Sequence, residues 1–193
     1  AQLFWERFLS DNPNELLKPH NLENSLPFFS AALDRYINEF PLIESGLNHT
    51  QKLILSAIDC PASELLYFRY CLGLDGDAKS QKSLKNYNDT LMSKPTFKRI
   101  FWQLQDMEAA PFMGDLCIYK EIKFMLDLDV PLISTSKNGE QTEYQLTDIG
   151  KDILNDKQHW LDHNSFDYWR GGVHISKSTP WQWVSSNKCF VTH

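Results

Sequence analysis

The chain has 193 residues, 42% of them hydrophobic, and a formal net charge of −6. A chain of this length and composition can bury one substantial core or two small ones, which predicts a globular protein. It has no apolar run near the about 18 residues that a membrane helix needs, and its N-terminus lacks the basic start of a signal peptide. We therefore expect a cytoplasmic protein without a membrane contact.

Residues 1–47 are predicted to form a helical extension. Asp11 or Asn12 is a candidate N-cap in front of Pro13, whose missing N–H costs nothing in a first helical turn. Farther along, apolar residues recur with the helical period until Pro41 ends the run. This apolar stripe comprises Phe29, Leu33, Tyr36, Ile37 and Phe40.

Residues 48–157 are predicted to form a winged-helix-like unit. Two short helices, at 48–58 and 62–72, are joined around Pro61 in the manner of the first two helices of a helix-turn-helix, although any helical hairpin has the same pattern. We interpret residues 73–111 as an insertion that starts as a polar loop. Its second part predicts a helix at 97–107 with Thr96 as N-cap.

The third helix of this unit is predicted at 115–126, with Asp115 as N-cap. Its predicted buried side consists of Leu116, Tyr119, Ile122, Phe124 or Met125, and Leu126.

A β-hairpin and one further helix complete the unit. Residues 131–136 and 142–146 read as strands, and Asn138-Gly139 between them is a dipeptide that tolerates positive φ. Thr147 is the predicted N-cap of the last helix, 148–155. Helices, then a hairpin, then a helix is the winged-helix order, so the predicted fold class is α+β, mainly α.

Residues 158–193 are predicted to form a helical turn and a small β segment. The stretches V-H-I, W-Q-W-V and C-F-V alternate or run apolar, with turn residues between them. We expect this segment, the extension and the winged-helix-like unit to pack as one body.

The C-terminal motif gives the chain a family resemblance. Asn164, Asp167, Trp169, Gly171-Gly172, Val173 and His174, followed by Trp181 and Trp183, form an N-x-x-D-x-W-x-G-G-V-H pattern with a W-x-W strand. In this it resembles the C-terminal half of a family of uncharacterised bacterial proteins. The resemblance implies no established reaction or ligand. It also implies a further N-terminal domain, and because the first residue is Ala, we expect this chain to lack it.

Nucleic-acid binding is one functional hypothesis. Residues 111–156 hold four Lys and Arg against nine Asp and Glu, a balance that repels phosphate at the predicted third helix and wing. The basic stretch lies elsewhere, at 79–99, with aromatic residues among its cations, so it is either a single-strand contact or a solvated loop. Its cations are Lys79, Lys82, Lys85, Lys94, Lys98 and Arg99.

A catalytic site in the motif is a second hypothesis. Asn164, Asp167, Arg170 and His174 supply an amide, an acid, a cation and a base, but no nucleophile motif completes a relay. The alternative is structural: Trp169 fills the core, Gly171-Gly172 forms a bulge or a tight entry into the strand, and Asp167 and His174 hydrogen-bond to the backbone at that join.

Metal and cofactor chemistry is not predicted. His159 and His163 are four residues apart, but no H-E-x-x-H motif occurs, so two surface histidines are the simpler interpretation. The cysteines, Cys60, Cys71, Cys117 and Cys189, lie far apart without C-x-x-C and are expected to be reduced thiols. We expect neither a metal nor a cofactor.

Together these features favour a non-enzymatic interaction module of a larger, regulatory bacterial protein. Its partner is predicted to be another protein or the missing N-terminal domain, with nucleic acid as the alternative. The sequence does not predict the oligomeric state.

Overall fold

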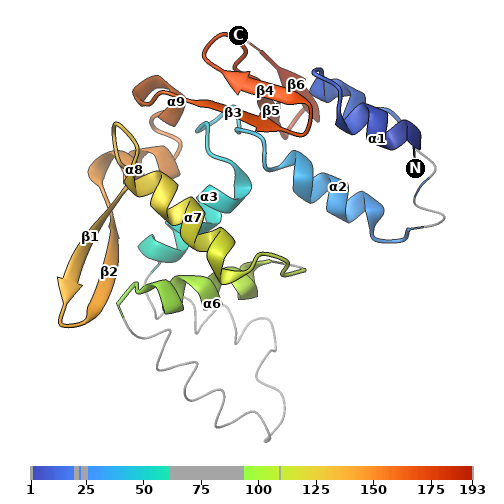
Figure 1. The fold of residues 1–193 in the computed structure, drawn as a ribbon. Helices are drawn as coiled ribbons and strands as arrows, with labels where there is room; N and C mark the ends of the chain where they lie inside the picture. The colour runs from blue at the N-terminus through green and yellow to red at the C-terminus, as the bar shows by residue number, and fades with distance from the viewer. Residues whose placement is uncertain (1, 20–21, 23–25, 61–93, 109, 193) are drawn as a thin grey trace, which may run out of the picture. The chain divides into compact units, whose positions relative to one another are not determined.

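The computed structural model of the chain describes residues 2–19, 22, 26–60, 94–108 and 110–192. Within these residues the protein is α+β, with seven α-helices and three two-stranded antiparallel sheets (Figure 1). This matches the predicted fold class at the level of mainly helix with small β elements. No helix of the described part is long and apolar enough to cross a membrane.

The chain divides into two compact units. Ala1–Thr50 and Asn155–His193 form the first, which we call the terminal unit, and Gln51–Leu154 forms the second, the central unit. The N-terminal helices and the C-terminal strands therefore share one unit, although residues 51–154 lie between its two segments in the sequence.

The terminal unit contains four helical segments and four short strands. The helical segments are α1 (Gln2–Phe8), the 3-10 helix η1 (Pro13–Leu17), α2 (Phe29–Ile37) and α9 (Trp160–His163). The strands are β3 (Asp167–Arg170), β4 (Val173–Ser176), β5 (Gln182–Val184) and β6 (Cys189–Val191), paired as β3-β4 and β5-β6.

The core of the terminal unit joins both ends of the chain. It consists of Leu16, Leu33, Ile37, Phe40, Val173, Ile175, Trp183 and Phe190. Asn12 caps η1 by accepting a hydrogen bond from the Asn14 N–H at 3.1 Å, in front of Pro13 as predicted, but the helix is 3-10 rather than α. Burial of this apolar cluster is the main stabilising term of the unit.

The central unit consists of helices and one β-ribbon. Its elements are α3 (His49–Asp59), which begins in the terminal unit, α6 (Phe97–Met107), α7 (Asp115–Leu126), β1 (Ile133–Asn138), β2 (Gln141–Leu146) and α8 (Asp148–Leu154). α6 packs against α7 and β2, α7 against β1, and α8 against β2. The predicted helix at 62–72 and most of the predicted loop at 73–96 lie outside the described residues.

Two helix caps of the central unit are where the sequence places them. The Thr96 hydroxyl accepts the Arg99 N–H at 3.4 Å at the start of α6, and the Thr147 hydroxyl accepts the Gly150 N–H at 3.0 Å at the start of α8. Each satisfies a backbone donor that the first helical turn leaves unpaired.

The start of α7 differs from the prediction. Gly114, not Asp115, is the N-cap, and no side chain caps this helix. The Asp115 carboxylate instead accepts the N–H of the next residue at 2.7 Å. Its negative charge still lies in the first turn, where it interacts favourably with the helix dipole.

The turn between β1 and β2 is shifted by one residue from the prediction. Asn138 pairs with Gln141, so the two-residue loop is Gly139-Glu140 rather than Asn138-Gly139. Gly139 has φ +62°, which explains the glycine at this place. Asn138 is therefore the last residue of β1, and its side chain donates a hydrogen bond to the Glu143 carboxylate at 2.8 Å.

Candidate functional site

The β3-β4 hairpin brings Asp167 and His174 together. The Asp167 Oδ1 and His174 Nε2 atoms are 2.7 Å apart across the hairpin. Trp169 pairs directly with His174, and their rings are stacked with centroids 4.7 Å apart. Side chains alternate between the faces of a strand, so all three lie on the outer face of the hairpin, while Val173 and Ile175 point into the core.

Trp169 contradicts the structural interpretation of the motif in one respect. It was predicted to fill the core, but its side chain is 64% exposed. The neighbouring Tyr168, on the other face of β3, packs against the core instead. The side of β3 that was predicted to face the core therefore faces outward, and the opposite side of the strand packs on the core.

The Asp167–His174 pair has no nucleophile beside it in the described part of the chain. The hydroxyls on β4 and the following turn bond to one another: Ser176 Oγ lies 2.9 Å from Ser178 Oγ and 3.0 Å from Thr179 Oγ1. No described serine, threonine or cysteine side chain is hydrogen-bonded to the His174 ring. An acid and a base without a nucleophile do not form the relay of a hydrolase.

The two glycines of the motif have a packing role. Gly171-Gly172 is the two-residue loop between β3 and β4, and Gly171 has φ +57°. The Gly172 N–H donates to the Phe8 carbonyl at 3.0 Å, at the end of α1. A Cβ on Gly172 would lie 1.9 Å from the Leu9 carbonyl oxygen, so only glycine lets the hairpin approach α1 this closely.

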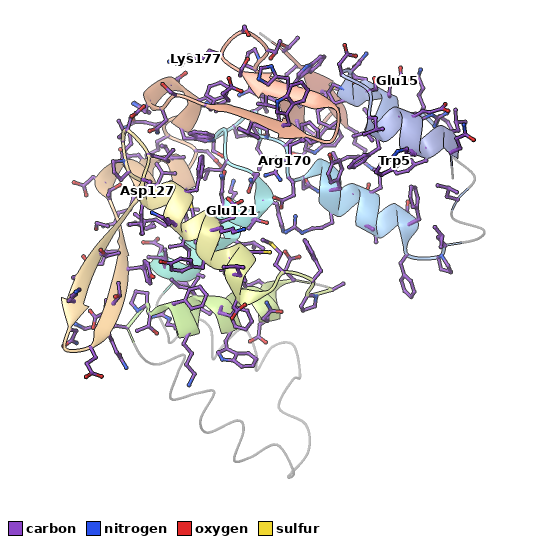
Figure 2. All side chains as sticks on the ribbon, in the orientation of Figure 1. Trp5, Glu15, Glu121, Asp127, Arg170 and Lys177 are labelled. Carbon is purple, nitrogen blue, oxygen red and sulfur yellow. The ribbon has the colours of Figure 1, made fainter. Side chains whose placement is uncertain are left out.

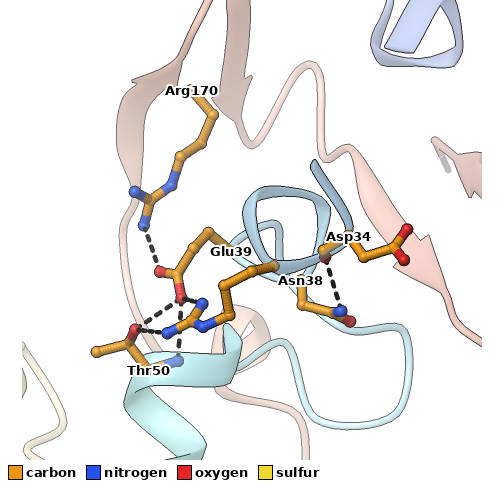
Figure 3. A network of polar contacts seen from close by, with 6 residues as sticks. Asp34, Asn38, Glu39, Thr50 and Arg170 are labelled. Atoms are coloured by element: carbon orange, nitrogen blue, oxygen red, sulfur yellow. Dashed lines mark hydrogen bonds and ion pairs between the residues drawn. The ribbon is translucent and has the colours of Figure 1, made fainter. Parts of the chain in front are cut away.

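Arg170 points to the opposite face of the hairpin from His174. There it enters a polar network around Glu39, drawn in Figure 3, in which its Nη2 lies 3.6 Å from Glu39 Oε2. Arg35 forms an ion pair with the same carboxylate. Thr50 donates to Glu39 Oε1 through its hydroxyl at 2.6 Å and through its N–H at 3.3 Å. The carboxylate thus occupies the anion position at the start of α3.

This Glu39 network was not predicted from the sequence. Its one local signal is the i,i+4 spacing of Arg35 and Glu39 at the end of α2, which is typical of an ordinary helix-surface ion pair. The ion pair that links distant parts of the chain joins Glu39 to Arg170. Since three segments of the terminal unit meet at this largely buried carboxylate, its role is to hold them in one arrangement.

Tyr36 lies beside the same network. Burial raises the pKa of the Tyr36 hydroxyl, and the positive charge of Arg170 opposes this increase. The Tyr36 ring packs against Phe8 and Phe40, with centroids 5.1 Å and 6.0 Å apart. The tyrosine is therefore neutral at physiological pH and acts as a packing residue of the core.

Asn164 is separate from the Asp167–His174 pair. Its side chain is buried at the C-cap of α9 and donates to the Trp160 carbonyl at 3.5 Å. Of the four candidate catalytic residues, Asp167 and His174 are the two that come together.

The two histidines considered for metal binding do not share a helix face. His159 is the N-cap of α9, with its Nε2 2.8 Å from the Gln182 amide, and His163 ends the same helix in an exposed position. Among the described residues, no three His, Cys, Asp or Glu side chains are grouped so as to hold a metal ion.

The described part of the basic stretch is largely engaged within the central unit. Arg99 is buried, and its guanidinium donates to the Gln103 side chain at 3.0 Å and to the Cys60 carbonyl at 2.5 Å. Burial lowers its pKa. Lys94 forms an ion pair with Glu143 at 3.1 Å, whereas Lys98 is exposed. The remaining three cations, Lys79, Lys82 and Lys85, lie outside the described residues.

The buried side of α7 differs from the buried side that the sequence predicted. Leu116 and Tyr119, predicted to be buried, are 61% and 47% exposed, whereas Ile118, Ile122 and Met125 are fully buried. An exposed leucine and tyrosine one turn apart make this helix surface apolar where it meets solvent. The Tyr119 ring also contacts Phe97 of α6, with centroids 5.9 Å apart.

Comparison of the chain with models of protein families, with curated proteins and with solved structures finds no match.

Proposed function

We propose that the central unit is a winged-helix-like module that binds a protein partner through the exposed side of α7, without catalytic activity. The observation that carries this proposal is the outward position of Leu116 and Tyr119 on the helix that corresponds to the third helix of such a fold.

The order of elements supports the winged-helix part of the proposal. A winged helix usually has a short strand between its first two helices, and this strand pairs with the wing. Here Thr96 forms an isolated antiparallel bridge with Glu143, and the Tyr144 N–H donates to the Pro95 carbonyl at 2.8 Å. With this bridge as the first strand, α3, α6 and α7 correspond to the three helices and β1-β2 to the wing.

This correspondence changes the role given to residues 73–111. The sequence interpretation placed the second helix at 62–72 and treated 73–111 as an insertion, but α6 lies within that range. In the proposed module α6 is the second helix. It contacts both α7 and β2, as a helix of the central three-helix arrangement does.

The charges of α7 favour a protein over a nucleic acid as the partner. A recognition helix needs Arg, Lys, Asn or Gln free to reach base edges and phosphates. On α7, Lys123 pairs with Asp127 at 2.5 Å, and Asp115 and Glu121 add negative charge. Lys120 and Lys98 are the exposed cations of α6 and α7 without a carboxylate partner among the described residues. Two separated cations release too few counterions for strong binding.

Site-specific photo-crosslinking tests the proposal. A photoreactive phenylalanine analogue replaces Leu116 in the full chain, which is expressed and irradiated in bacterial cells. A discrete protein adduct is expected, because this side chain projects into solvent at the proposed contact. The matched control carries the analogue at Ser178, an exposed turn residue of the terminal unit, and is expected to give no such adduct.

Two results would count against the proposal. A nuclease-sensitive adduct from position 116 would assign the surface to a nucleic acid. Equal yields from positions 116 and 178 would show random collision rather than a binding surface.

A further inference from the structure

Three side chains on the outer face of the β3-β4 hairpin form a cluster that is open to solvent. Asp167, Trp169 and His174 contact one another, and the strand register places all three on this face. Trp169 is 64% exposed, and the side chains of Asp167 and His174 are 76% and 36% exposed. We call this set the hairpin cluster. Its internal contacts fix its geometry, while its exposure leaves it accessible to a ligand.

Trp169 offers one free face of its indole ring. The other face stacks on His174, with 4.7 Å between the ring centroids and 17° between the ring planes. Because the residue is still 64% exposed, most of the exposed area belongs to the face away from His174. An aromatic surface of this kind gains free energy when an apolar surface covers it. The stacking on His174 also orients the ring in advance, so binding costs little conformational entropy.

Asp167 adds a hydrogen-bond acceptor beside the indole. Asp167 and Trp169 are two residues apart on β3, which places them about 7 Å from one another on the same face. The carboxylate Oδ1 is held by His174 Nε2 at 2.7 Å. The Oδ2 atom has no hydrogen-bond partner among the described residues, and it belongs to a largely exposed side chain. A hydroxyl group that donates to such an oxygen forms a charge-assisted hydrogen bond.

The charges of the hairpin disfavour an anionic ligand. Arg170 is the one Lys or Arg residue of β3 and β4, and it points to the opposite face, where it pairs with Glu39. Lys177, the next cation along the chain, lies in the turn after β4 (Figure 2). With His174 neutral, the hairpin cluster carries the single negative charge of Asp167. It would therefore repel a phosphate group or a nucleic acid.

The contact between His174 and Asp167 favours a neutral ligand over a cation. A guanidinium group, which combines ring stacking with carboxylate binding, is held most tightly when it reaches both carboxylate oxygens, but here His174 occupies Oδ1. A hydroxyl needs one acceptor oxygen, which Oδ2 supplies. The matching ligand thus has an apolar face for the indole and hydroxyl groups at its edge. A pyranose ring has this combination, because C–H bonds line its face and hydroxyls project from its rim.

We propose that the hairpin cluster is a binding site for a neutral saccharide. A pyranose ring stacks on the free face of Trp169, and one of its hydroxyls donates to Asp167 Oδ2. His174 is a positioning residue, since it supports the indole from the other side and fixes the carboxylate. The site belongs to the terminal unit, whereas the α7 surface belongs to the central unit, so either can exist without the other.

Nuclear magnetic resonance of the full chain tests this proposal. The indole N–H resonance of Trp169 is identified, among those of the six tryptophans, by its loss in Trp169→Phe. Cellotetraose, maltotetraose, mannotetraose and tetra-N-acetylchitotetraose are each added to about 10 mM, well above the about 1 mM dissociation constant expected for one stacked ring and one charge-assisted hydrogen bond. The Trp169 resonance should shift and saturate with at least one of them. No shift with any of the four overturns the proposal.

Three substitutions locate the site, with binding followed by saturation transfer from the protein to the saccharide protons. Trp169→Ala should remove the saturable binding. Asp167→Asn should raise the dissociation constant about fivefold, because a neutral hydrogen bond replaces a charge-assisted one. Trp5→Ala is the matched control: Trp5, on α1 (Figure 2), is a tryptophan of the same unit with a similar exposure of 58%, and binding should tolerate its loss.

Two further results would overturn the proposal. Binding that survives Trp169→Ala places the saccharide elsewhere on the chain. A Trp169 resonance that responds to arginine or choline chloride and to none of the saccharides assigns the hairpin cluster to a cation. Circular dichroism checks the fold of each variant, and Asp167→Asn decides if Trp169→Ala unfolds: an unchanged dissociation constant would then show that the carboxylate does not contact the saccharide.

Discussion

The two hairpins with glycine turns, β1-β2 in the central unit and β3-β4 in the terminal unit, have loops of equal length and different surroundings. Gly139 has no atom within 4 Å of where a Cβ would lie, whereas the Gly172 position is filled by the backbone of Leu9. In the first hairpin the glycine serves the turn alone. In the second, Gly171 serves the turn with φ +57°, and Gly172 makes room for α1. The same residue type in the same motif can therefore have a local role or a long-range one.

Gly172→Ala should have the largest effect. The new Cβ would overlap the Leu9 carbonyl, so α1 or the hairpin must move, at a cost of about 3 kcal/mol in the free energy of unfolding. Gly139→Ala, the control, meets no atom and should cost about 1 kcal/mol because of its positive φ. Urea unfolding followed by circular dichroism compares the two. Equal losses would show that the close approach of Gly172 to Leu9 adds no cost beyond that of an ordinary turn glycine.

Glu39→Gln should have the next largest effect. It removes the charge that pairs with Arg35 and Arg170 but keeps the shape, and it leaves two partly buried guanidinium groups facing one another. Allowing for their partial exposure to solvent, we expect a loss of about 2 kcal/mol in the free energy of unfolding. Glu44→Gln, an exposed neighbour, is the control and should change little. If Glu39→Gln leaves the urea midpoint unchanged, the Glu39 network does not stabilise the terminal unit.

The β1-β2 ribbon should respond to acid through Glu143. The Asn138 side chain, by donating a hydrogen bond, and Lys94, by its charge, lower the pKa of this carboxyl below its ordinary value of 4.5. A carboxyl whose pKa is lower in the folded state stabilises the fold above its unfolded pKa and loses that contribution as the pH falls through the folded pKa. The protection factors of the ribbon amides, which are exchange rates corrected for the intrinsic pH dependence, should therefore fall as the pH falls below 4.5.

The Glu143→Gln variant provides the reference for this pH effect. Its ribbon should be less protected at pH 7 and should lack the extra loss of protection in acid. If the parent and the variant follow the same pH profile, the carboxylate contributes nothing to the ribbon.

The smallest effect is expected from His174→Ala. The substitution removes the contacts to Asp167 and Trp169 on the outer face of the β3-β4 hairpin, where a cross-strand pair contributes about 0.5 kcal/mol. A small fall in the urea midpoint is therefore predicted. A variant that unfolds at the same midpoint as the parent would leave the pair without a structural role and make it a target for ligand screening.

The sequence predicted the elements better than their faces. Residues with strong local signals, such as Thr96 and Thr147 at helix starts, occupy the predicted places because capping depends on neighbours within one turn. α7 is different: its segment L-C-I-Y contains four successive apolar residues, so the helical period fits more than one buried side. Packing against α6 and β1 selects Ile118 over Leu116, and neither partner is visible in the local pattern.

Local sequence patterns also predicted the candidate site only in part. Asp167 and His174 were predicted as a pair, and the hairpin joins them because they are seven residues apart across a short turn. Arg170 was grouped with them, but strand alternation sends it to the other face, where its partner is Glu39. Contacts between residues more than a hundred positions apart follow from tertiary packing, which no local pattern encodes.

The choice between protein and nucleic acid as the partner of the central unit is tested most directly by titrating the full chain into labelled single-stranded and double-stranded oligonucleotides at low and at physiological salt. With the charges of α7 paired or outnumbered, fluorescence anisotropy should show no association at either salt concentration. Binding at low salt that weakens steeply as salt is added, and that Lys98→Glu and Lys120→Glu abolish, would contradict the account and identify a nucleic-acid surface.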